Sequence, residues 1–164
     1  MEMILADESA TACTGAALAR NLPDVSSQNI LIGLSGELGS SKTTLARGML
    51  RALGVGGTIR SPTFTLVEPY ETSRGIVHHL DLFRLEAAAP ALEGIGFRDI
   101  RGQPGLVLVE WPERAGTGLG TPDLQARLEL QGTGRSLSLT ATGQSGQAWL
   151  DASRAALEEC GVSS

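Results

Sequence analysis

The segment 36–43 holds the residue types and spacing with the clearest chemical meaning. It reads GELGSSKT, close to the pattern G-x-x-x-x-G-K-[ST] of a phosphate-binding loop. In such a loop, glycines let backbone N–H groups wrap around phosphates, the lysine supplies a positive charge and the final hydroxyl binds Mg2+. Gly36, Lys42 and Thr43 fit the pattern, so the sequence predicts a site for nucleotide phosphates.

Lys42 is the only lysine in the chain. The 164 residues include 13 lysines and arginines, so the other 12 are arginines. A compact ammonium group on a flexible stem fits beside phosphates, where the wide, planar guanidinium does not. A chain that uses arginine at every other basic position therefore keeps lysine where phosphate chemistry requires it.

Ser41 departs from the pattern, which has glycine before the lysine. Serine adds a Cβ and a hydroxyl where the backbone comes closest to phosphate. If this residue takes a positive φ, a side chain costs on the order of 1 kcal/mol. We expect the loop to bind nucleotide with lowered affinity, and we expect Ser41 to affect hydrolysis more strongly than binding.

The loop needs a strand before it and a helix after it, and the sequence predicts both. Residues 29–34 form a short apolar run typical of a buried strand. Residues 43–53 place Leu45, Met49 and Leu50 on one side of a helix. A glycine-serine turn between two elements need not bind anything, but this order of elements favours the phosphate site.

The remaining elements alternate between strands and helices. We predict one domain, residues 1–164, with an α/β fold: a P-loop NTPase-like three-layer sandwich around a central mixed β-sheet. Asp7 or Ser9 is expected to cap the first helix. Strands are predicted at 3–5, 29–34, 64–70, 76–81, 106–110, 124–130 and 135–141, helices at 7–21, 43–53, 87–94 and 147–160, and a loop at 116–122.

Acidic side chains near the ends of two of these strands are candidates for the chemistry. Glu110 ends the apolar strand 106–110, at the edge where ligands of open α/β sheets bind, and a carboxylate there can complete an Mg2+ shell with Thr43. Asp81 shares a strand face with His79 and could orient a water molecule. His79 is otherwise an ordinary core or surface histidine. The hydroxyls of 61–65 suit a switch segment or a plain strand start.

Composition excludes several classes. The net charge is -5, which argues against a large nucleic-acid surface. The acidic N-terminus and the lack of a long apolar run predict a cytoplasmic protein with no membrane segment. Cys13 and Cys160 have no metal-ligand spacing, and we expect two free, buried thiols under reducing conditions.

Taken in order, the motifs resemble the bacterial TsaE (YjeE) family of tRNA threonylcarbamoyladenosine biosynthesis ATPases. Besides the phosphate loop they are TTLARG at 43–48, SPTFTLV at 61–67, HLDLFRL at 79–85, GIG at 94–96 and VEWPE at 109–113. The resemblance covers nearly the whole chain. It implies binding of ATP or ADP and Mg2+, association with TsaD and TsaB homologues, and hydrolysis that supports turnover of a complex modifying tRNAs that read codons beginning with A. The partners, rather than this chain, would hold the tRNA.

The resemblance also implies roles for single residues. Thr43 and Glu110 would bind Mg2+, Asp81 would be the catalytic aspartate acting with Lys42 and Glu110, and 61–65 would be the switch. Family members carry glycine where this chain has Ser41, so a normal ATPase rate does not follow. The implied nucleotide-binding set, with Thr11 near the adenine, is Thr11, Gly39, Ser40, Ser41, Lys42, Thr43, Thr44, Asp81 and Arg135.

The sequence also bears on three other functions. A GTPase that reads guanine through an Asn-Lys-x-Asp loop is excluded, because Lys42 is the only lysine. A P-loop small-molecule kinase needs an arginine-rich lid, for which Arg98 and Arg101 are thin evidence. A nucleotide-sensing assembly subunit, in which Ser41 has reduced or abolished hydrolysis, is the main alternative to an ATPase.

Overall fold

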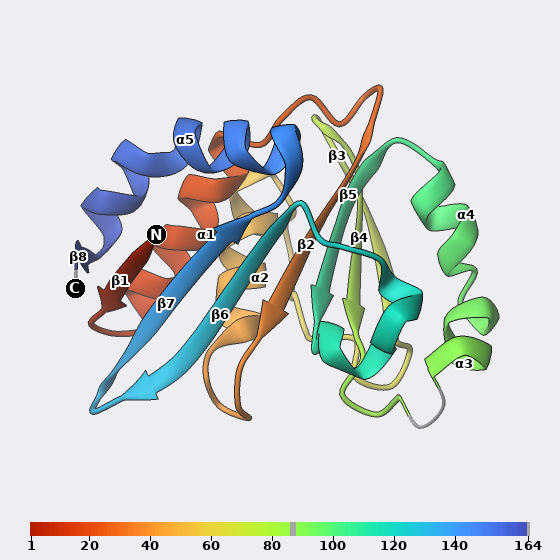
Figure 1. Ribbon diagram of the computed structural model, residues 1–164, viewed down its shortest axis with the longest axis horizontal. Helices are drawn as coiled ribbons and strands as arrows, with labels where there is room; N and C mark the ends of the chain where they lie inside the picture. Colours follow the sequence, from red (N-terminus) through yellow and green to blue (C-terminus); the bar gives the residue numbers. More distant parts are fainter. Residues whose placement is uncertain (86–87, 164) are drawn as a thin grey trace.

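The computed structural model describes residues 1–85 and 88–163. In this part of the chain the strands form one mixed sheet, in the order β3-β4-β5-β2-β6-β7-β1-β8 (Figure 1). The strands are β1 (Glu2–Leu5), β2 (Asn29–Ser35), β3 (Val67–Thr72), β4 (Gly75–Asp81), β5 (Gly105–Glu110), β6 (Leu124–Gln131), β7 (Gly134–Ala141) and β8 (Val162–Ser163).

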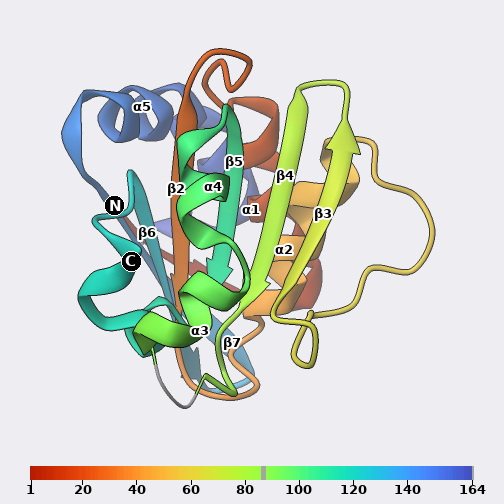
Figure 2. The ribbon, with the colours of Figure 1, turned by 90° about the vertical axis from the view of Figure 1, so that its right-hand side faces the viewer.

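Helices cover both faces of the sheet, as Figures 1 and 2 show. One face carries α1 (Glu8–Arg20), α2 (Lys42–Ala52) and α5 (Gly143–Cys160). The other carries α3 (Ala88–Gly94), α4 (Phe97–Gly102) and the 3-10 helix η1 (Pro112–Leu119). No helix in the described residues has the length and apolar composition needed to cross a membrane.

The apolar sequence of β5 explains the two covered faces. Leu106 and Leu108 point into the core beneath α1 and α2, whereas Val107 and Val109 point into the core beneath α3 and α4. A strand whose side chains are buried on both sides reads as a continuous apolar run. The predicted α/β sandwich with a mixed central sheet is therefore confirmed.

The central strands run parallel, and their register sets the position of the site. Leu34 of β2 is level with Glu110 of β5, and Glu110 is level with Asp81 of β4. The carboxyl ends of parallel strands meet at one edge of a sheet. The loop after β2 therefore begins beside the two carboxylates.

Two glycines bring α1 and α2 unusually close together. A Cβ at Gly15 would meet the carbonyl oxygen of Leu45, and a Cβ at Gly48 would meet that of Ala12. Asp7 caps α1, since its Oδ1 accepts a 2.8 Å hydrogen bond from the Ala10 N–H. Thus α2, which follows the loop at 36–41, is packed against α1, whose first residue is fixed by the Asp7 cap.

Several boundaries differ from the sequence prediction. The strand expected over 64–70 begins at Val67, because Leu66 has a φ of 64° and its N–H bonds to the Pro62 carbonyl, closing a turn. The helix expected over 147–160 begins at Gly143. The first part of the loop predicted at 116–122 belongs to η1, which spans 112–119, and α4 and β8 were not predicted at all. Of the helix expected at 87–94, Ala87 lies outside the described residues.

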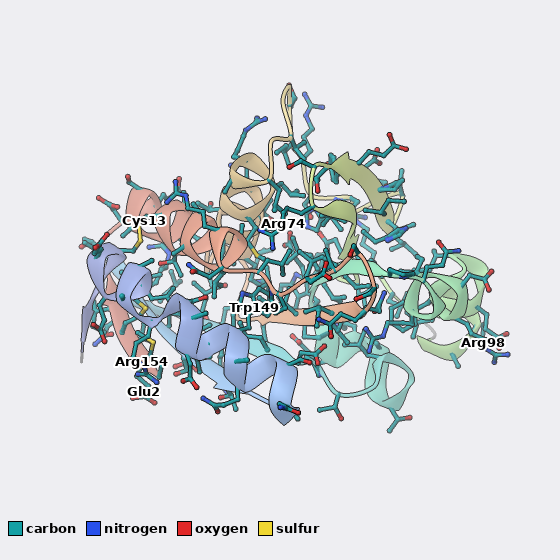
Figure 3. All side chains as sticks on the ribbon, turned by 90° about the horizontal axis from the view of Figure 1, so that it is seen from above. Glu2, Cys13, Arg74, Arg98, Trp149 and Arg154 are labelled. Atoms are coloured by element: carbon teal, nitrogen blue, oxygen red, sulfur yellow. A yellow bond between two sulfur atoms is a disulfide. The ribbon has the colours of Figure 1, made fainter. Side chains whose placement is uncertain are left out.

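The prediction of two free, buried thiols is wrong. Cys13 on α1 and Cys160 at the end of α5 form a disulfide, with Cα atoms 5.6 Å apart, and Cys13 is exposed. Figure 3 labels Cys13 on α1 and Trp149 on α5. The indole N–H of Trp149 donates a 2.9 Å hydrogen bond to the Leu18 carbonyl of α1, which packs the two helices together. This packing brings together cysteines that are 147 positions apart in sequence.

Gly15→Ala is expected to destabilise the protein by about 1–3 kcal/mol, because the added methyl forces α1 away from the Leu45 carbonyl. Urea unfolding followed by circular dichroism measures the change. Gly56→Ala is the matched control, since a Cβ at Gly56 would have no neighbouring heavy atom within 4 Å and this residue has no positive φ. Equal stability of the two variants would contradict the close helix packing.

Reduction of the disulfide is expected to lower the free energy of unfolding by about 2–4 kcal/mol, since a cross-link over a long loop restricts the unfolded chain. Urea titrations with and without dithiothreitol give this difference, and the Cys13→Ser, Cys160→Ser double variant should not respond to the reductant. Two titratable thiols in the untreated protein would show that the bond does not form.

Candidate functional site

The loop between β2 and α2 has the backbone shape of an anion-binding turn. Gly39 and Ser41 both take left-handed conformations, with φ values of 81° and 75°. The Ser40 N–H bonds to the Glu37 carbonyl at 3.1 Å, which closes the turn. Left-handed residues in such a turn direct successive N–H groups into one concavity, and the N-terminus of α2 adds a positive dipole end.

Lys42 extends across this loop. Its Nζ donates to the carbonyl oxygens of Gly36 and Glu37, both at 2.7 Å, and to the Ser40 Oγ at 3.2 Å. The same Nζ lies 4.0 Å from the centre of the Trp111 ring, within cation–π range. The ammonium group is therefore held by uncharged acceptors, which an anionic phosphate oxygen could replace.

Burial makes the Lys42 charge costly in the absence of an anion. Its side chain is 5% exposed, and this burial lowers the pKa of Lys42, while the charges of Glu110, Glu113 and Asp81 oppose the shift. A bound phosphate would add negative charge beside the ammonium. The site is thus electrostatically prepared for an anion.

Thr43 and Glu110 form the candidate metal shell. The Thr43 hydroxyl donates to Glu110 Oε2 at 2.9 Å, and Glu110 Oε1 lies 2.8 Å from His79 Nε2, which donates because a carboxylate only accepts. Glu110 and His79 are both buried.

These oxygen donors suit Mg2+, which prefers oxygen ligands and keeps several waters or phosphate oxygens in its shell. The described residues contain no cluster of three or more His, Cys, Asp or Glu side chains placed to hold a metal. A fit to Mg2+ therefore depends on ligands from bound nucleotide and water, as is usual for this ion.

Asp81 is the point where the segment 61–65 meets the site. Its Oδ2 accepts hydrogen bonds from the hydroxyls of Ser61 and Thr63, the latter at 3.1 Å, and its Oδ1 accepts from the Phe83 N–H at 3.0 Å. The carboxylate is buried. Two hydroxyls of the expected switch segment, those of Ser61 and Thr63, are thus hydrogen-bonded to the expected catalytic aspartate.

One cavity of about 300 Å³ gathers most of the predicted residues. Among the predicted residues, its lining includes Gly39, Ser41, Lys42, Thr43, Thr44, Ser61, Thr63, Asp81 and Glu110. A larger hollow of about 750 Å³ lies over β6 and β7 and reaches Gly36 and Glu37, but neither Lys42 nor either buried carboxylate lines it. The smaller cavity is therefore the candidate site.

Three predicted residues do not line this cavity. Thr11 is fully buried, and its hydroxyl donates to the Asp7 carbonyl at 3.0 Å. Ser40 is buried beneath the loop, where its Oγ accepts from Lys42. Arg135 reaches the loop from β7, and its Nε donates to the Ser41 Oγ at 3.0 Å. Their direct contact with nucleotide remains a prediction.

The cavity lining also includes residues that the sequence did not assign to the site. Glu8, Leu38 and Phe83 line it together with Trp111. Trp111 directly follows the acid at the end of β5, and from that position the sequence predicts a ring that packs over the nucleotide or the switch segment, or else an ordinary core aromatic. Its ring packs against Phe83 with centroids 5.0 Å apart. Glu8 lies in the first turn of α1, close in sequence to Thr11.

Comparison with solved structures identifies the fold. The chain resembles the crystal structure of YdiB from Bacillus subtilis, with a TM-score of 0.73 over 93% of each chain and 20% sequence identity. At this identity the likeness concerns the fold alone. It agrees with the α/β arrangement described above.

Sequence comparison identifies the family. The family model described as "Threonylcarbamoyl adenosine biosynthesis protein TsaE" matches residues 5–137. The chain is 38% identical to the tRNA threonylcarbamoyladenosine biosynthesis protein TsaE of Haemophilus influenzae, covering 68% of this chain and 70% of that protein. The Synechocystis protein of the same name is 41% identical, over 70% and 71% of the two chains, and that of Rickettsia felis 32%, over 82% and 78%. The chain therefore belongs to the TsaE family.

Proposed function

We propose that this protein is the ATP-binding, Mg2+-dependent ATPase subunit required for threonylcarbamoyladenosine modification of tRNAs that read codons beginning with A, acting with TsaD and TsaB homologues. The observation that carries the proposal is the buried Lys42 ammonium, held inside a left-handed loop beside the Thr43–Glu110 pair. The names of the relatives support the tRNA process. The net charge of -5 supports a subunit whose partners hold the tRNA.

The residues would divide the work as follows. Lys42 exchanges its carbonyl partners in the loop for phosphate oxygens, and the loop N–H groups hold the same phosphates. Thr43 and Glu110 would hold Mg2+, which would supply positive charge to offset the negative charge of the phosphates. Asp81 would orient a water molecule toward the γ phosphorus and accept its proton, as the water oxygen bonds to that phosphorus and the bond from the phosphorus to the ADP oxygen breaks. For Asp81 to act in this way, Ser61 and Thr63 must give up their hydrogen bonds to its carboxylate.

A nucleotide-sensing subunit with little hydrolysis is the second candidate. It is favoured by one observation, the serine in the left-handed position before Lys42. Phosphate release by the protein mixed with its partner subunits separates the two candidates. A small-molecule kinase gains no support, because neither Arg98 nor Arg101 lines the cavity and Arg101 is bonded to Asn29 at the start of β2.

We expect the unmodified protein to bind ATP and ADP with micromolar affinity. Lys42→Ala is expected to abolish this binding, because the loop loses the charge that faces the phosphates. Isothermal titration calorimetry with Mg2+ measures the affinity. Arg154→Ala is the control, since it also removes one positive charge but lies exposed on α5. Unchanged affinity in the lysine variant would refute the phosphate site.

Glu110→Gln is expected to retain the fold and to lose Mg2+-dependent hydrolysis in the complex by about 100-fold or more, because an amide is a poor ligand for this ion. Phosphate release at varied Mg2+ measures the effect, with the exposed Glu158→Gln as control. Activity and Mg2+ dependence equal to those of the unmodified protein would remove Glu110 from the metal shell.

A further inference from the structure

Ser41 has its own tertiary partner. Its Oγ accepts a 3.0 Å hydrogen bond from Arg135 Nε, although the two residues are 94 positions apart. The Nη1 of the same guanidinium donates to the carbonyl oxygens of Thr133 and Gly134, both at 3.2 Å. Arg135 is therefore oriented by its own turn and directed at the loop residue that stands in place of glycine.

The backbone of the same hairpin also presses against the phosphate loop. A Cβ at Gly36, the first residue of the loop, would meet the carbonyl oxygen of Leu128 on β6. Gly134, at the start of β7, is in turn held against β1, because a Cβ there would meet the carbonyl oxygen of Leu5. The β6–β7 hairpin thus contacts the loop at its beginning, through backbone, and near its end, through Arg135.

We propose that Arg135 is a positioning residue for nucleotide binding, which acts by holding the Ser41 hydroxyl and so fixing the left-handed backbone that precedes Lys42. The inference rests on the proposed nucleotide site and deepens it. It differs from a direct contact between Arg135 and nucleotide, because the action passes through the serine side chain.

The conformational cost of serine at position 41 and the stabilisation from the Arg135 hydrogen bond are comparable in energy. A side chain at φ 75° and ψ 27° is disfavoured by roughly 1–2 kcal/mol. A hydrogen bond from a charged donor contributes about 1.5–3 kcal/mol, less where water competes, as it does at these half-buried groups. The bond from Arg135 can therefore offset the cost of serine in this conformation.

Without that bond, the loop would spend less time in the conformation that presents its N–H groups to phosphate. The observed affinity equals the intrinsic affinity multiplied by the fraction of molecules in the binding conformation. Glycine at position 41 would not need the bond, because glycine adopts left-handed conformations readily. The serine and the arginine are therefore expected to be coupled.

The test is a double-mutant cycle read by calorimetric titration of ATP and Mg2+. Arg135→Ala and Ser41→Ala are each expected to weaken ATP binding by about tenfold, the loss corresponding to one such hydrogen bond. In a Ser41→Gly background, Arg135→Ala should cause no further loss of affinity, as expected of strongly coupled residues. Arg127→Ala, on the same hairpin but exposed and paired with Glu129, is the control.

The outcomes separate the possibilities. An equal loss from Arg135→Ala in the serine and glycine backgrounds would overturn the inference, because it indicates either direct contact with nucleotide or a general effect on the fold. Unchanged affinity in Arg135→Ala would overturn it as well. Thermal unfolding without nucleotide shows whether each variant is folded. Absence of ATP binding by the unmodified protein would overturn the proposed function itself, which is a distinguishable result.

Discussion

The parallel register of β2, β5 and β4 is the constraint on which the site depends. It places Leu34, Glu110 and Asp81 side by side on neighbouring strands. The phosphate loop starts two residues after Leu34, so its lysine and threonine reach the same edge as both carboxylates. A slip by one residue would turn the carboxylates to the opposite face of the sheet.

The same edge concentrates buried polar groups, and their charged atoms are hydrogen-bonded to one another or to neighbouring groups. Lys42 bonds to loop carbonyls, Glu110 to Thr43 and His79, and Asp81 to two hydroxyls and an N–H. His79 Nδ1 is one of two buried side-chain polar atoms in the described residues that lack a partner. Buried charges are tolerated only when they are paired in this way. The arrangement therefore holds the site in shape at a cost to stability that the two apolar cores must offset.

What could be predicted from the sequence was local. The strand, loop and helix around Lys42 follow from an apolar run, a glycine pattern and a helical spacing, all within about 25 residues. The acid at the end of β5 follows from a strand pattern and a rule about sheet edges. The Cys13–Cys160 bond and the Arg135–Ser41 bond join residues 147 and 94 positions apart. No periodicity encodes such pairs, because they depend on how α5 and the β6–β7 hairpin pack. The start of β3 was predicted wrongly for a different reason. Leu66 takes a positive φ, and an apolar sequence gives no indication of such a backbone conformation.

Ser41 shows how a departure from a motif changes which parts of a fold a site depends on. With glycine, the left-handed residue before the lysine needs no support, and the loop is determined mainly by local sequence. With serine, the same backbone carries a conformational cost, and Arg135 from β7 donates a hydrogen bond to the Oγ that glycine would lack. The crowding expected from sequence assumed that the hydroxyl points at phosphate. Since the hydroxyl instead accepts from Arg135, the backbone of the proposed nucleotide site is linked to the β6–β7 hairpin, and we expect changes in that hairpin to alter the site without any contact with nucleotide.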